Sequence, residues 1–164
     1  MKIQNLNDLF VDELQDLYSA EKQIIEALPK MAEKAASPEL KQGLLRHLEQ
    51  TREQKRRLEQ IFESIPGVDR DKRTCQGMEG IIEEGEKLIK DAKDPETRDA
   101  GMISSAQRVE HYEIAGYSTA RTYATLLGRP EWARLLQVTL DEEKDTDRKL
   151  NTIAERINVE ARAA

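Results

Sequence analysis

Hydrophobic residues recur every three or four positions along most of the chain, which is the spacing of one face of an α-helix. Signals for the start and end of helices divide this pattern. Asn5 or Asn7 can cap the start of the first helix, Ser-Pro and Asp-Pro pairs begin later helices, and Gly128 ends one. Pro29 is expected to bend the first helix without ending it. The sequence therefore predicts four long helices and one shorter helix. Their expected ranges are about 5–35, 38–66, 78–91, 95–128 and 130–157.

The connections restrict how these helices can be arranged. The turns within the first pair and within the last pair of long helices are very short, so each pair should form an antiparallel hairpin. The segment between the pairs is long enough to run the length of a bundle whose helices span roughly 42 to 50 Å. The sequence thus predicts an all-α, ferritin-like four-helix bundle, a single domain over residues 1–164 in which 158–164 form a flexible tail. An up-down bundle with a helical excursion between its halves is the alternative.

The apolar face of each long helix is interrupted by polar residues near its middle. The helix midpoints fall near residues 20, 51, 111 and 143, and antiparallel helices of similar length place their midpoints in one layer. Polar side chains from all four helices should therefore converge at the centre of the bundle. The candidates are Glu21, His47, Glu110, Glu113, Glu143 and Asp147.

Such a cluster is difficult to accommodate in an apolar interior. An ionised, unpaired carboxylate there costs several kcal/mol, and no Lys or Arg occupies the same helix faces to neutralise it. Divalent cations would relieve the repulsion directly, and ligation by carboxylates and imidazole suits iron, manganese or zinc. We therefore expect a site for two divalent metal ions. The alternatives are that the glutamates are protonated, or that they lie at the edge of the core and reach solvent.

Composition narrows the class of protein. The chain has 26 Lys and Arg against 32 Asp and Glu, a formal net charge of −6, whereas a general nucleic-acid binder needs a positive surface. No stretch approaches the roughly 20 apolar residues of a membrane span, and the first residues lack the apolar block of a secretory signal. A single cysteine, Cys75, cannot form an internal disulfide. We expect a cytoplasmic protein that binds neither nucleic acid nor membranes.

Five short motifs make the chain recognisable. They are Tyr18-Ser-Ala-Glu21-Lys-Gln, His47-Leu-Glu-Gln50-Thr51, Cys75-Gln-Gly-Met78-Glu-Gly80, Glu110-His-Tyr-Glu113-Ile-Ala and Glu142-Glu143-Lys-Asp-Thr-Asp147. In this order the motifs resemble the YciE/YciF family of bacterial stress-associated proteins, and the resemblance runs from about Leu6 to Ile157. It implies a ferritin-like, rubrerythrin-related bundle that forms a homodimer and holds two metal ions between its helices, with iron favoured over manganese or zinc.

The resemblance also shows where this chain departs from the wider ferritin-like ligand pattern. The matching positions are Glu21, Glu110, Glu113 and Glu143. The second helix has Gln50 where most relatives are expected to have Glu, and the last helix has Thr146 or Asp147 in place of His. Gln50 joins the candidate ligands, although the change from Glu to Gln removes a negative charge from the set.

Two functions follow. The sequence does not decide between them, and it leaves the question of enzyme activity open. One is a di-iron or di-manganese metal-binding stress-response protein whose metals react with oxygen or peroxide. The other is a non-catalytic dimeric scaffold, in which the metal site is vestigial or only stabilises the fold. Iron storage would require a closed shell of many subunits, which the family resemblance disfavours.

Overall fold

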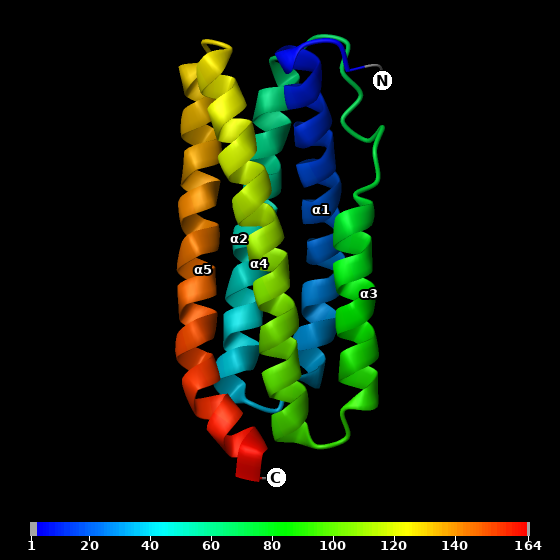
Figure 1. The fold of residues 1–164 in the computed structure, drawn as a ribbon, viewed down its shortest axis with the longest axis vertical. Coiled ribbons are helices and arrows are strands. Elements are labelled where there is room, and N and C mark those ends of the chain that lie inside the picture. The colour runs from blue at the N-terminus through cyan, green and yellow to red at the C-terminus, as the bar shows by residue number, and fades with distance from the viewer. Residues whose placement is uncertain (1–2, 164) are drawn as a thin grey trace.

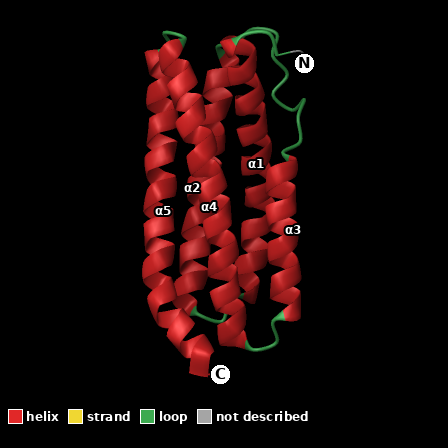
Figure 2. Cartoon of the chain, viewed as in Figure 1, coloured by secondary structure: helices red, strands yellow, loops and turns green. Residues whose placement is uncertain are grey.

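The computed structural model describes residues 3–163, which form α-helices and connecting segments without any strand (Figures 1 and 2). The helices are α1 (Leu6–Lys34), α2 (Pro38–Glu63), α3 (Gln76–Asp91), α4 (Pro95–Leu126) and α5 (Pro130–Ala163). The predictions of an all-α fold and of its five helices are confirmed. The predicted boundaries agree to within about three residues except at the end of the last helix.

Local capping explains where the helices begin. Asn5, and not Asn7, caps α1 by accepting a hydrogen bond from a backbone N–H in the first turn at 3.0 Å. Ser37 and Asp94 cap α2 and α4 in the same way. Gly128, just beyond α4, has φ of 69°, the left-handed conformation that a glycine adopts without steric penalty.

The last helix is longer than predicted. The expected tail after Ile157 is instead helical as far as Ala163, so that prediction is wrong for residues 158–163, and residue 164 lies outside the described part. Ile157 is buried and anchors this end of α5 on the core. Arg156 pairs with Glu160, one turn further along α5, at 3.0 Å, a spacing that supports a helix. Residues 158–164 contain neither proline nor glycine to end the helix.

The four long helices form a bundle with α3 alongside it. Helix α1 packs against α2 and α4, helix α5 packs against α2 and α4, and α3 lies on α1 and α4. Helices α1 and α5 run in one direction and α2 and α4 in the other, so the segment 64–94, which contains α3, crosses the length of the bundle (Figure 1). The predicted pair of hairpins joined by a long crossover is therefore the observed chain path, and the up-down alternative is wrong.

The core consists of two separate apolar clusters. One contains Phe10, Leu14, Leu58 and Tyr117 at the end where α1 begins. The other contains Ile24, Leu28, Leu44, Met102 and Ile153 at the opposite end. Buried polar residues occupy the layer between them. Within the described residues, none of the helices has an apolar stretch long enough to cross a membrane.

Helix α3 is fastened to the bundle through Cys75. This residue is fully buried and caps α3, because its Sγ accepts a hydrogen bond from the N–H of Met78 at 3.3 Å. The hydroxyl of Tyr112 on α4 lies 3.0 Å from this sulfur and donates to Asp16 on α1 at 2.6 Å. Burial raises the pKa of the Cys75 thiol. Through its contacts with Asp16, Tyr112 and Met78, the sulfur joins the start of α3 to α1 and α4.

Candidate metal centre

The polar layer of the core contains four carboxyl groups and one imidazole, contributed by all four long helices. They belong to Glu21 on α1, His47 on α2, Glu110 and Glu113 on α4, and Glu143 on α5. None of these residues is more than 6% exposed. The layer lies between the two apolar clusters, as the interruption of each apolar face predicts, so these five candidates do converge.

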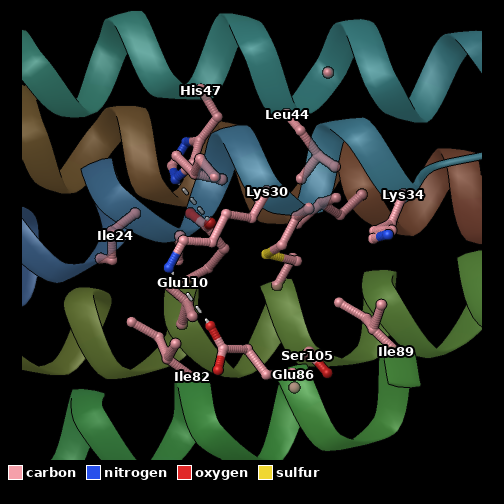
Figure 3. A pocket seen from close by; sticks show the side chains of 18 of the residues that line it. Ile24, Lys30, Lys34, Leu44, His47, Ile82, Glu86, Ile89, Ser105 and Glu110 are labelled. Atoms are coloured by element: carbon pink, nitrogen blue, oxygen red, sulfur yellow. Dashed lines mark ion pairs between the residues drawn. The ribbon is translucent and has the colours of Figure 1, made fainter. Parts of the chain in front are cut away.

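Three of these side chains are close enough to share one ion. His47, Glu110 and Glu143 each offer a ligand atom, and the three atoms lie within 4.8 Å of one another. The Nε2 atom of His47 is 3.3 Å from Oε1 of Glu110, a pair that Figure 3 shows directed toward each other across the space between α2 and α4. One nitrogen and two oxygen donors are a suitable set for a divalent transition metal.

Glu21 and Glu113 complete the layer. The hydroxyl of Tyr117, which is fully buried, donates a hydrogen bond to Oε1 of Glu21. Tyr117 lies one turn beyond Glu113 on the same face of α4, a position from which its hydroxyl orients a carboxyl group of the layer. Glu113 lies close enough to Glu21, Glu110 and Glu143 for the charge of each to act on it.

Many atoms of this layer have no hydrogen-bond partner within residues 3–163, although they are shielded from solvent. They are Oε2 of Glu21, both ring nitrogens of His47, Oε2 of Glu110, both carboxyl oxygens of Glu113 and Oε2 of Glu143. Buried polar groups in proteins are almost always paired, because an unpaired one costs about 1–3 kcal/mol. Unpaired carboxylate oxygens and imidazole nitrogens facing one another are the donor set of a metal site, so these residues fit divalent cations.

The pKa values of several groups in this layer are strongly shifted. Burial, and after it the charge of Glu143, raises the pKa of both Glu21 and Glu110 well above its usual value. Burial and the charge of Glu21 do the same to the pKa of Glu113. Burial lowers the pKa of His47, so its ring is held neutral, the form that binds a metal. The raised pKa values favour protonated Glu21, Glu110 and Glu113 in metal-free protein, and metal ions would replace these protons.

The two remaining candidates, Gln50 and Asp147, do not join the cluster. Both side chains are half-buried. Asp147 lies 3.4 Å from Nε2 of the exposed His111 and accepts a hydrogen bond from Gln107 at 3.2 Å. Gln50 lines a neighbouring cavity. Their assignment as metal ligands stays a prediction, and in the structure they lie at the edge of the site.

Gln54 also contacts the layer, although it is not among the residues predicted from the sequence. It is fully buried, and its amide nitrogen donates to Oε1 of Glu143 and to Oε2 of Glu142, the latter at 3.2 Å. Glu142 also accepts two hydrogen bonds from Arg57, at 2.6 and 2.8 Å. The available signal was spacing: Gln54 follows His47 by seven residues, about two turns, and therefore shares its helix face. Gln54 holds the carboxyl group of Glu143 in place.

Comparison with known proteins places the chain in a family. A family model described as a domain of unknown function (DUF892) matches residues 5–163. Protein YciF of Escherichia coli (strain K12) is 44% identical over 154 residues, which cover 94% of this chain and 93% of that protein.

Solved structures agree with this match. The crystal structure of the E. coli stress protein YciF superposes with a TM-score of 0.91 at 42% identity, covering 94% of this chain and 98% of the other. A protein of Rhodopseudomonas palustris described as a candidate structural protein superposes with a TM-score of 0.88 at 42% identity, covering 92% and 96% of the two chains. The resemblance based on the five motifs is confirmed.

Proposed function

The chain belongs to the DUF892 family and is related to the E. coli stress protein YciF, and we propose that it is a metal-binding stress-response protein with a two-metal carboxylate centre in a ferritin-like bundle. The observation that carries this proposal is the buried layer of four glutamates and one histidine whose facing atoms lack partners. Divalent ions would provide partners for all of these atoms at one level of the core. The crossover topology is the one that such carboxylate centres use.

In this proposal the side chains of the layer are divided between two ions. His47, Glu110 and Glu143 would hold one ion, since their donor atoms lie within 4.8 Å of one another. Glu21 and Glu113 would hold the second. Glu113 is the best bridging group, because it lies among the other three glutamates and has both oxygens unpaired within the described residues.

Iron is the favoured metal, with manganese or zinc as alternatives. A bound ferrous pair would supply electrons to oxygen or peroxide. The protein's own part is to exclude water, to hold the glutamates in one layer and to keep His47 neutral. Tyr117 and Gln54 orient Glu21 and Glu143 through hydrogen bonds, as residues behind metal ligands commonly do.

Metal analysis tests the proposal. Protein loaded anaerobically with Fe²⁺, or with Mn²⁺ or Zn²⁺, and then desalted should retain stoichiometric metal. Because the chain has two histidines, they form a matched pair of variants: His47→Gln should lose most of the bound metal, whereas His111→Gln, which alters an exposed ring, should retain it. Wild-type protein without bound metal, or equal retention by the two variants, would contradict the proposal.

A second function has a specific observation in its favour. The related R. palustris protein is described as a candidate structural protein, and Gln50 removes a negative charge where a ligand glutamate was expected. In this case the protein is a non-catalytic homodimeric scaffold whose metal only stabilises the bundle. Rapid oxidation of bound Fe²⁺ with consumption of peroxide would exclude the scaffold role, while stabilisation by metal without turnover would support it. Sizing chromatography tests the homodimer in the same samples.

A further inference from the structure

A large cavity lies beside the candidate metal centre. Its volume is about 620 Å³, and residues from all five helices line it. This volume is typical of a small-molecule site, for which about 300–1,000 Å³ is usual. His47 and Glu110 form part of its inner wall, at the middle of the bundle (Figure 3).

Aliphatic side chains form most of the remaining wall. They include Ile24, Leu28, Met31, Leu44, Ile82 and Ile89, and Figure 3 shows four of them, Ile24, Leu44, Ile82 and Ile89, around one space. The hydroxyl of Ser105, which also lines the cavity, is already bonded to the carbonyl of Gly101 at 3.1 Å. This aliphatic part of the wall favours a hydrocarbon chain, because burial of each CH₂ group is favourable.

The outer end of the cavity carries a basic rim. We use this name for Lys34, Lys90, Lys93 and Arg98, which come from the ends of α1 and α3, the segment between α3 and α4, and the start of α4. The residues that line the cavity include seven Lys or Arg and two Glu, whereas the chain as a whole has more acidic than basic residues. The ammonium groups of Lys34 and Lys90 make no ion pair within residues 3–163, whereas Lys30 pairs with Glu86 at 3.9 Å (Figure 3). The rim is therefore suited to an anionic head group.

We propose that this cavity binds a single-chain amphipathic monocarboxylate, of the fatty-acid class, with its head on the basic rim and its tail directed toward the metal centre. The reverse orientation would bury the carboxylate head beside four buried glutamates, where it would lose its hydration. Ten residues separate Ile24 from Lys34 on α1, a rise of about 15 Å, which suits a tail of medium length. The site goes beyond the proposed metal binding and needs no ion.

Calorimetric titration of EDTA-treated protein, whose metal content is checked separately, tests this binding without involving the metal centre. The probes are hexanoate, octanoate, decanoate and dodecanoate, each below its micellar concentration. Affinity should increase about fourfold per added CH₂ until the tail fills the cavity. Decyltrimethylammonium, which has a similar tail and a cationic head, should bind at least about tenfold more weakly than decanoate because the rim is basic.

Two leucine substitutions form a matched pair. A Cβ atom added at Gly43, on the cavity wall in α2, meets only Ile153 at 3.8 Å, so Gly43→Leu projects into free space and also improves helix propensity. It should weaken decanoate binding by about tenfold or more, the effect of displacing about two CH₂ groups. Gly80→Leu, on α3 where nothing lies within 4 Å and outside the lining, should leave binding unchanged.

The head-group assignment has its own pair of variants. Lys34→Gln combined with Lys90→Gln should weaken decanoate binding by about three- to tenfold, and added salt should reduce the difference. Lys41→Gln combined with Lys87→Gln, at exposed positions outside the lining, should have no effect. Absence of decanoate binding to the wild type, equal binding of the cationic probe, or equal affinity of the Gly43→Leu and Gly80→Leu proteins would overturn the proposal, whatever the metal analysis shows.

Discussion

Replacement of Glu113 by glutamine should make the metal-free protein more stable and the metal-loaded protein less responsive. Glu113 is fully buried with no partner for either oxygen within the described residues, and burial raises its pKa. The substitution Glu113→Gln removes the ionisable group, and the new amide can donate a hydrogen bond to Glu21 or Glu143. Relief of an unpaired buried group of this kind is worth about 1–3 kcal/mol, which corresponds to a rise in Tm of about 2–12 °C for a chain of this length.

Metal should stabilise the wild-type protein more than the Glu113→Gln protein. If the free metal concentration is about 100 times Kd, binding stabilises the native state by about 2.7 kcal/mol, so wild-type Tm should rise by about 5–11 °C. Glu113→Gln lacks the proposed bridging carboxylate and should gain little. Thermal unfolding followed by circular dichroism, with EDTA and then with anaerobic Fe²⁺, Mn²⁺ or Zn²⁺, measures both effects.

Glu84→Gln is the control, because it makes the same chemical change at an exposed position on α3. Its Tm should match that of the wild type with and without metal. Two results would refute the reasoning: a wild-type Tm that responds to none of the three metals, and a Glu113→Gln protein with the full wild-type response. A metal-free Glu113→Gln protein that is less stable than the wild type would show that Glu113 is satisfied in solution.

Three further predictions concern pH and two hydrogen bonds. Because the pKa values of the buried glutamates are raised, folded metal-free protein holds protons that the unfolded chain releases above about pH 4.5. The stability of metal-free protein should therefore fall as the pH rises from there, whereas metal-bound protein should gain stability. The lowered pKa of His47 acts in the opposite direction and removes stability below about pH 6.5. Urea unfolding across this range measures both slopes, and a metal response independent of pH would contradict them. Tyr117→Phe leaves Oε1 of Glu21 unpaired and should cost about 1–3 kcal/mol in the same assay; an unchanged midpoint would disprove the bond. Cys75→Ala removes the cap of α3 and should cost about 0.5–2 kcal/mol and speed amide exchange in α3, whereas Cys75→Ser keeps a capping oxygen and should exchange more slowly than Cys75→Ala.

The metal layer could be predicted because two regular features combine. Side chains three or four residues apart share a helix face, and hairpins with short turns align the midpoints of their helices. Glu110 and Glu113 satisfy both conditions, and Glu21, His47 and Glu143 lie near the midpoints of their own helices. Their convergence needed no information about loop geometry.

The edge of the layer could not be predicted, because small rotations about a helix axis decide which side chains point inward. Gln50 lies about 60° around α2 from His47, whereas Gln54 lies about 20° away. Gln54 reaches the centre and Gln50 remains half-buried. Asp147, one turn beyond Glu143, is drawn toward His111 and Gln107 on the neighbouring helix. The sequence pattern resolves a helix face, but not the angle at which that face is presented to its neighbours.

The end of α5 shows a related limit. A polar segment without proline or glycine is compatible with a tail or a helix, and the burial of Ile157 together with the Arg156–Glu160 pair decides for the helix. The connection between α2 and α3 likewise had a predictable length, while the contact of Cys75 with Tyr112 and Asp16 depends on how three helices meet.

By itself, then, the amino-acid order determined the five helices, the pairing of the long ones, the family and the carboxylate-rich layer, because capping, periodicity and short turns act over a few residues. Only the tertiary structure decided which polar atoms remain unpaired, that Gln54 and Tyr117 hold the glutamates, and that a cavity with a basic rim opens beside them. These features arise from side chains that are distant along the chain, and their distances depend on the packing of all five helices at once.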